Sequence, residues 1–147
     1  MKILVAVDGS ELALDAVRHA LKLWSEGLKA DFVLANIQEP TYLYEMVMAP
    51  DAEVLERITG GAGSHALEGA EALFKAAGVA YEREIGSGDP APALIDIAEN
   101  HGCELIILGG KGMGALRTAL LGSVSEEVLK RSSVPVIVVK HPEADAG

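Results

Sequence analysis

The feature that most constrains the fold of this chain is a set of short apolar runs separated by segments with helical periodicity. Continuous apolar runs, without alternating polar residues, are typical of strands that a parallel sheet buries on both faces. Four segments carry this pattern: residues 3–7, 32–37, 105–108 and 134–139. A further segment, residues 79–85, alternates apolar and polar residues and is therefore predicted to be a half-exposed edge strand.

Helical patterns lie between these runs. The first has an apolar face from Ala13 to Trp24, with Ser10 as the expected N-cap, and we expect Trp24 to be part of the core. A second helical pattern covers residues 51–77. It contains the glycine-rich residues 60–63, which predict a kink or a break because glycine costs about 1 kcal/mol per helix position relative to alanine.

A strand followed by a helix, repeated along the chain, predicts a parallel sheet with helices on both faces, that is, a three-layer α/β/α fold. Two further helices, beginning near Asp89 and Ser123, complete this alternation. The length of 147 residues corresponds to one domain, residues 1–147, at the usual size of roughly 150 residues per domain. Ligands of such folds bind beyond the carboxyl ends of the strands, where the strand order reverses. These ends fall at Asp8, Ile37, Gln38, Gly86 and Gly109.

Composition and charge exclude several classes of function. The net charge of −10 argues against binding to nucleic acid or to an anionic membrane, because both need a basic protein surface. The one cysteine, Cys103, excludes an internal disulfide and a zinc site built from cysteines, and we expect its thiol to be part of the core. The apolar runs are too short to span a membrane and the first residues indicate a strand rather than a signal peptide, so we expect a cytoplasmic protein.

A glycine-rich segment after the fourth predicted strand is the main candidate for a binding site. Its pattern is Gly109-x2-Gly112-x9-Gly122-Ser123, which places flexible backbone between the carboxyl end of a strand and the N-terminus of a helix. Exposed N–H groups and the helix dipole favour an anion such as phosphate there, and glycine lets the backbone approach it closely. From the residues alone, a simple turn is an open alternative. Ser123 also has a second interpretation, because Ser123 and Glu126 match a capping box.

Other phosphate-binding signatures are absent from the sequence. The chain has no G-x-x-x-x-G-K-[ST] loop, and no G-x-G-x-x-G follows the first strand. Residues 8–12 do not form the Ser/Thr/Gly-rich loop of a flavodoxin. The third strand does not end in the phosphoacceptor aspartate of a response-regulator receiver, since it ends at Ile85 and Gly86.

Three stretches together resemble the universal stress protein family: MKILVAVDGS at residues 1–10, the glycine motif ending in Gly122-Ser123-Val124, and SVPVIVV at residues 133–139. The resemblance extends over nearly the whole chain. It implies a five-stranded parallel sheet in the order 3-2-1-4-5, Rossmann-like and of the adenine nucleotide alpha hydrolase type. It also implies a homodimer, formed through the last strand by Val136, Ile137, Val138 and Val139.

Within the family, the resemblance implies that this chain binds ATP, because members with the glycine motif bind it and members without the motif do not. Mg²⁺ is implied with the nucleotide, since Glu126 would otherwise lie near anionic phosphates without a cation. Two additional glycines, Gly110 and Gly114, imply a looser phosphate loop. The site residues that carry over are Ala6, Val7 and Asp8 beside the adenosine, Ile37 against the adenine, Leu108 and Gly109 along the nucleoside, and Gly112, Gly122, Ser123 and Val124 around the phosphates.

The resemblance implies an ATP-binding protein that acts as a nucleotide-dependent switch or binding module in the stress response. The alternative is a dimeric interaction protein of the same fold, in which the glycine segment is only a turn and no nucleotide is bound. An ATP-consuming enzyme is a weaker third interpretation, because such enzymes have a glycine- and serine-rich loop directly after the first strand. No residue of the sequence is identified as a catalytic base or as a metal ligand, so we expect at most slow ATP hydrolysis.

Overall fold

The computed structural model describes residues 1–39, 52–110 and 121–141, and for residues 52–60 it describes the helical backbone without the side chains. Gly112 and Gly114 of the predicted phosphate loop lie outside the described residues. The elements are β1 (Lys2–Ala6), α1 (Ala13–Ser25), β2 (Asp31–Gln38), α3 (Ala52–Ala77), β3 (Tyr81–Ser87), α4 (Pro90–Asn100), β4 (Leu105–Gly109), α5 (Ser123–Arg131) and β5 (Val136–Val139).

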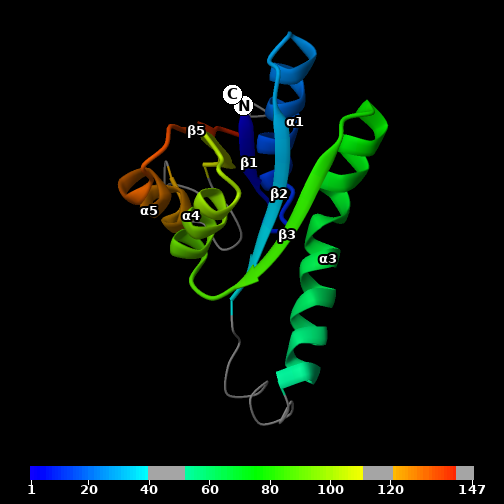
Figure 1. Ribbon diagram of the computed structural model, residues 1–147, viewed down its shortest axis with the longest axis vertical. Helices are drawn as coiled ribbons and strands as arrows, with labels where there is room; N and C mark the ends of the chain where they lie inside the picture. Colours follow the sequence, from blue (N-terminus) through cyan, green and yellow to red (C-terminus); the bar gives the residue numbers. More distant parts are fainter. Residues whose placement is uncertain (40–51, 111–120, 142–147) are drawn as a thin grey trace, which may run out of the picture.

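The strands lie parallel in one sheet with the order β3-β2-β1-β4-β5, which confirms the predicted topology. α1 and α3 cover one face of the sheet and α4 and α5 cover the other, so the fold has three layers (Figure 1). The strand predicted at residues 79–85 is displaced to Tyr81–Ser87 and lies at the edge of the sheet, as expected. Because the strands are parallel, their carboxyl ends meet along one edge, the lower one in Figure 1.

The sheet separates two apolar cores, and alternate residues of one strand belong to different cores. Ile3 and Val5 pack toward α1 and α3, whereas Leu4 packs toward α4 and α5. In the first core Phe74 of α3 lies edge-to-face with Phe32 and with Tyr81, at ring-centroid distances of 5.2 and 5.6 Å. Burial on both faces is the reason why these strands have continuous apolar sequences.

The prediction of a kink or a break at residues 60–63 was wrong, because α3 is one helix from Ala52 to Ala77. One of these glycines is explained by close packing against the sheet, because the helix is continuous at this point. A Cβ atom on Gly63 would overlap the side chain of Ile85 on β3, whereas a Cβ atom on Gly61 would have no neighbour within 4 Å. Gly63 therefore lets α3 lie close against the edge strand. Tertiary packing of α3 outweighs the low helix propensity of its glycines.

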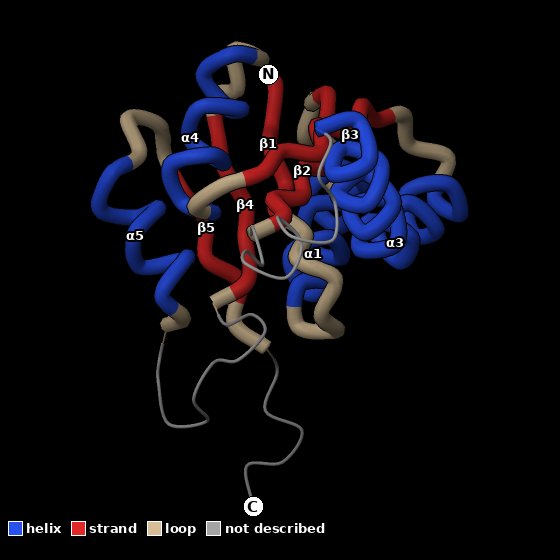
Figure 2. Tube along the Cα trace, turned by 90° about the horizontal axis from the view of Figure 1, so that it is seen from below, coloured by secondary structure: helices blue, strands red, loops and turns tan. Residues whose placement is uncertain are grey.

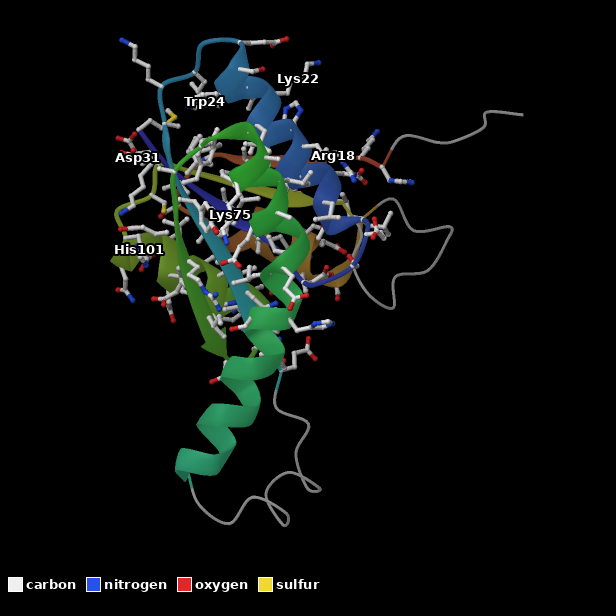
Figure 3. All side chains as sticks on the ribbon, turned by 90° about the vertical axis from the view of Figure 1, so that its right-hand side faces the viewer. Arg18, Lys22, Trp24, Asp31, Lys75 and His101 are labelled. Carbon is white, nitrogen blue, oxygen red and sulfur yellow. The ribbon has the colours of Figure 1, made fainter. Side chains whose placement is uncertain are left out.

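The prediction that Trp24 belongs to the core was also wrong, since the residue is 40% exposed. The buried face of α1 is made of small residues from its first turns: Ala13, Ala16, Val17 and Ala20. Trp24 follows in the last turn of α1, at the end of the molecule where Asp31 begins β2 (Figure 3). Helical periodicity predicts which face of a helix turns inward, but it does not indicate where the surface beneath that face ends.

Candidate functional site

The candidate site lies at the carboxyl edge of the sheet, where the strand order reverses between β1 and β4. The chain leaves β1 toward α1 on one face, and the helix that follows β4, α5, covers the other face. The register that pairs Val5 with Ile107 brings residues 6–8 next to Leu108 and Gly109. Figure 2 shows the molecule from this edge, with the sheet between the two helical layers. Doubly wound sheets bind ligands at such switch points.

Four of the predicted residues meet on one apolar surface at this edge. Leu108 belongs to the core under α4 and α5, and Ala6, Ile37 and Val124 pack against that core as partly buried side chains. They come from β1, β2, β4 and the start of α5, segments that are far apart in the sequence. The structure thus brings three side chains that were expected to line a nucleoside, Ala6, Ile37 and Leu108, together with Val124, which was expected near the phosphates.

Val7 lies at the same edge, but its side chain points away from this surface. It belongs to the core under α1 and α3 and is 2% exposed. The Val7 N–H donates to the carbonyl of Ala35 at 2.8 Å, and the Val7 carbonyl accepts a hydrogen bond from Nδ2 of Asn36 at 2.8 Å. The Val7 side chain therefore does not face the candidate site, and both of its backbone polar groups are bonded within the protein.

Asp8 begins the turn that connects β1 to α1. Its Oδ1 accepts hydrogen bonds from the backbone N–H of Ser10 at 2.9 Å and from the Ser10 hydroxyl at 2.6 Å. The prediction that Ser10 is the N-cap of this helix was wrong, because α1 begins at Ala13 and its N-cap is Leu12. The Ser10 Oγ still accepts the N–H of Ala13 at 3.2 Å, within the turn that precedes the helix. Gly9 has φ +90°, and Ala66 of α3 lies 3.2 Å from where a Cβ would be, so both conformation and space require glycine.

The N-terminus of α5 faces the same edge. Gly122 is the N-cap with φ −78° and ψ 167°, and Ser123 is the first helical residue, exposed, with no side-chain capping hydrogen bond recorded at this end. The predicted capping box between Ser123 and Glu126 was therefore wrong, because the helix starts one residue earlier than that motif requires. The exposed Ser123 hydroxyl is left at the start of α5, where N–H groups without helical partners favour an anion.

Ser125 was missed by the sequence analysis and connects the two ends of the glycine segment. Its hydroxyl is buried and is 2.9 Å from the carbonyl of Gly110 and 3.0 Å from that of Gly122. The Gly122 N–H also donates to the Gly110 carbonyl, at 2.5 Å, and the Gly110 N–H donates to Val139 of β5 at 2.9 Å. The base of the segment is thus fixed to the sheet. The sequence feature that could have indicated this role is that Ser125 lies on the same helical face as Val128, where an apolar residue would be expected.

Two side chains of the described residues that could carry chemistry, Glu126 and Cys103, are both held in structural contacts. Glu126, the acid that suggested a cation, is paired with Lys130 at 3.5 Å on the surface of α5. Among the described residues, no group of three or more His, Cys, Asp or Glu side chains is arranged to hold a metal ion. Cys103 is buried in the core, as predicted, and burial raises the pKa of its thiol, so it is not a ready nucleophile.

No helix among the described residues has the length and apolar character needed to cross a lipid bilayer. The parallel sheet, the two helical layers and the reversal of strand order at the switch point define a Rossmann-like, doubly wound α/β protein. A family model described as the universal stress protein family matches residues 1–140, and the chain belongs to that family.

Individual relatives support the same assignment. The universal stress protein YxiE of Bacillus subtilis is 30% identical over 149 residues, covering 95% of this chain and 98% of the relative. The solved structure of MJ0577 from Methanocaldococcus jannaschii has a TM-score of 0.81 and 30% identity, with 97% of each chain covered. A universal stress protein solved in complex with cAMP has a TM-score of 0.60 and 26% identity, with 95% of each chain covered.

Proposed function

We propose that the protein binds an adenine nucleotide, ATP with Mg²⁺, at the carboxyl edge of the sheet and acts in the cytoplasm as a nucleotide-dependent switch or binding module in the stress response. The observation that carries this proposal is the convergence of Ala6, Ile37, Leu108 and Val124 near the N-terminus of α5. An apolar surface beside backbone N–H donors suits the two parts of a nucleotide, which are a flat base and anionic phosphates.

The two parts of the ligand are assigned to different segments. In this proposal Ala6, Asp8, Ile37, Leu108 and Gly109 lie along the adenosine, with the backbone of Val7. The phosphates lie along Gly112, Gly122, Ser123 and Val124, in reach of the N–H groups in the first turn of α5. Mg²⁺ would be held chiefly by phosphate oxygens and water, as is usual for this ion in nucleotide sites.

Local charge is compatible with a small anion despite the acidic composition of the whole chain. Residues 104–140 contain five basic and three acidic side chains, a balance of +2, whereas the chain as a whole carries −10. A relative of 26% identity solved with cAMP supports an adenine nucleotide as the class of ligand. Of the predicted site residues that the structure describes, only Asp8 and Ser123 have polar side chains, so we propose binding with at most slow hydrolysis.

Isothermal titration calorimetry with ATP and Mg²⁺ tests this proposal. We expect saturable binding of one nucleotide per chain, and we expect adenine nucleotide to be released when the purified protein is denatured. The control is GTP under the same conditions, which should bind more weakly if the base is recognised. Absence of binding at about millimolar ATP would mean a binding free energy weaker than roughly −4 kcal/mol. That result would instead support a dimeric interaction protein that uses no nucleotide.

We further propose that the chain forms a homodimer through β5. This strand pairs with β4 on one side only, and its residues Val136, Ile137, Val138 and Val139 are all partly exposed in one chain. The Ile106 N–H donates to the Pro135 carbonyl and the Gly110 N–H to that of Val139, so odd-numbered residues of β5 face β4. The backbone groups of Val136 and Val138 therefore face the open edge, where a second strand can pair.

Replacing Val138 by proline is expected to convert the dimer to a monomer. Proline removes an N–H from the open edge of β5 without removing a bond to β4, so the fold should persist. Light scattering should give about twice the mass of one chain for the wild type and for Val138→Ala, which keeps the N–H. A dimer that survives Val138→Pro unchanged would exclude β5 as the contact.

A further inference from the structure

Asn36 is a buried amide at the point where β1 and β2 separate. It is 1% exposed, and it is one of two buried polar residues in the described part of the chain. Its Nδ2 donates to the Val7 carbonyl at 2.8 Å, and its Oδ1 accepts a hydrogen bond from Nε2 of Gln38 at 2.7 Å. The side chain thus links Val7, the residue after β1, to Gln38, the last residue of β2.

The two ladders of β2 end at different places. β2 pairs with β3 as far as Gln38 and Ser87, but its paired register with β1 ends at Ala6 and Ala35. Among the described residues, the last backbone bond in the β1 direction runs from the Val7 N–H to the Ala35 carbonyl. In a parallel ladder the next bond would run from the Ile37 N–H to the Val7 carbonyl. The amide of Asn36 binds that carbonyl.

We propose that Asn36 is a positioning residue of the nucleotide site, which ends the β1–β2 ladder and keeps the Ile37 N–H available to a ligand at the carboxyl edge of the sheet. The ligand group it serves is a hydrogen-bond acceptor on a flat base, because Ile37 lies on the apolar surface with Ala6 and Leu108. This inference rests on the proposed function and specifies how the base end of that site is formed.

The chemistry of the position requires an amide. The Val7 carbonyl needs a donor and the Gln38 amide needs an acceptor, and asparagine supplies both with one short side chain. Leucine has similar volume but neither group, so it leaves the Val7 carbonyl available to the Ile37 N–H. Closure of that bond would withdraw the N–H from the ligand.

The test compares adenosine and ATP as probes of Asn36→Leu by calorimetry. We expect the affinity for both to fall by the same factor, about tenfold, because one hydrogen bond at the base is lost. The matched control is Val33→Ala, which shortens a fully buried side chain of the same strand away from its carboxyl end and should lower the melting temperature without changing either affinity. A purely structural role of Asn36 predicts that Asn36→Leu behaves like this control.

If Asn36→Leu does not fold, Gln38→Met serves as the second variant, because it removes only the donor that orients Asn36. We expect a loss of about threefold for both probes. Wild-type affinity in the folded Asn36 variant, or in Gln38→Met if that is the one tested, would overturn the inference while leaving the proposed function intact. Absence of adenosine and ATP binding in the wild type would overturn both.

Discussion

Replacing Gly122 by valine is expected to abolish ATP binding while the fold stays intact. The backbone of Gly122, at φ −78° and ψ 167°, is extended and open to any residue, so its conformation does not explain why glycine occupies this N-cap. Its carbonyl accepts the N–H of Glu126, and its own N–H donates to Gly110, bonds that a side chain would not break. A valine side chain would instead occupy space in front of α5, where the phosphates are proposed to lie.

Calorimetry and thermal unfolding together check this prediction. Valine is a poor N-cap, so a loss of stability of about 1 kcal/mol is expected, too small to unfold the protein. No binding should be measured up to about millimolar ATP, whereas adenosine, which has no phosphates, should bind as it does to the wild type. This pattern is the opposite of that expected for Asn36→Leu, in which adenosine and ATP lose affinity equally. Normal ATP affinity in Gly122→Val would remove the glycine segment from the site.

The fold could be predicted from the sequence because the apolar pattern of each strand reflects how many of its faces are buried. A run such as residues 3–7, apolar on both faces, fits only a strand covered by helices on both sides, and its alternation with helical segments sets a parallel sheet. The place of the candidate site was predicted by the same reasoning, since parallel strands end at one edge. Ala6, Ile37 and Leu108 meet there because each is at or next to the end of its strand.

What could not be predicted depends on contacts between distant segments. The partners of Asn36 and Ser125 are backbone carbonyls of Val7 and Gly110, which no local pattern indicates. Successive side chains of a strand point to opposite faces of the sheet, and Val7 points to the face that α1 and α3 cover. Its position at the end of β1 did not show to which face its side chain points. The capping box at Ser123 has the right residues, but tertiary bonds around Gly110 set the start of the helix instead.

The glycine-rich part of α3 gives the largest expected change in stability. Gly63 is buried at the point where α3 crosses β3, and an added Cβ would overlap the β-branched side chain of Ile85. Because Ile85 has restricted rotamers, the overlap must be relieved by moving the helix. Gly63→Val is therefore expected to lower the free energy of unfolding by about 2–3 kcal/mol, the usual range for an overpacked contact.

A second glycine of the same helix separates packing from helix propensity. Gly61 is exposed and has open space around its Cβ position, so Gly61→Ala is expected to raise the free energy of unfolding by about 1 kcal/mol. Urea unfolding followed by circular dichroism measures both variants. Ile85→Ala should be less harmful combined with Gly63→Val than in the wild type, because the shortened side chain vacates the space that valine needs. If Gly63→Val raised the free energy of unfolding as much as Gly61→Ala, the backbone of α3 could not lie as close to Ile85 of β3 as the structure places it.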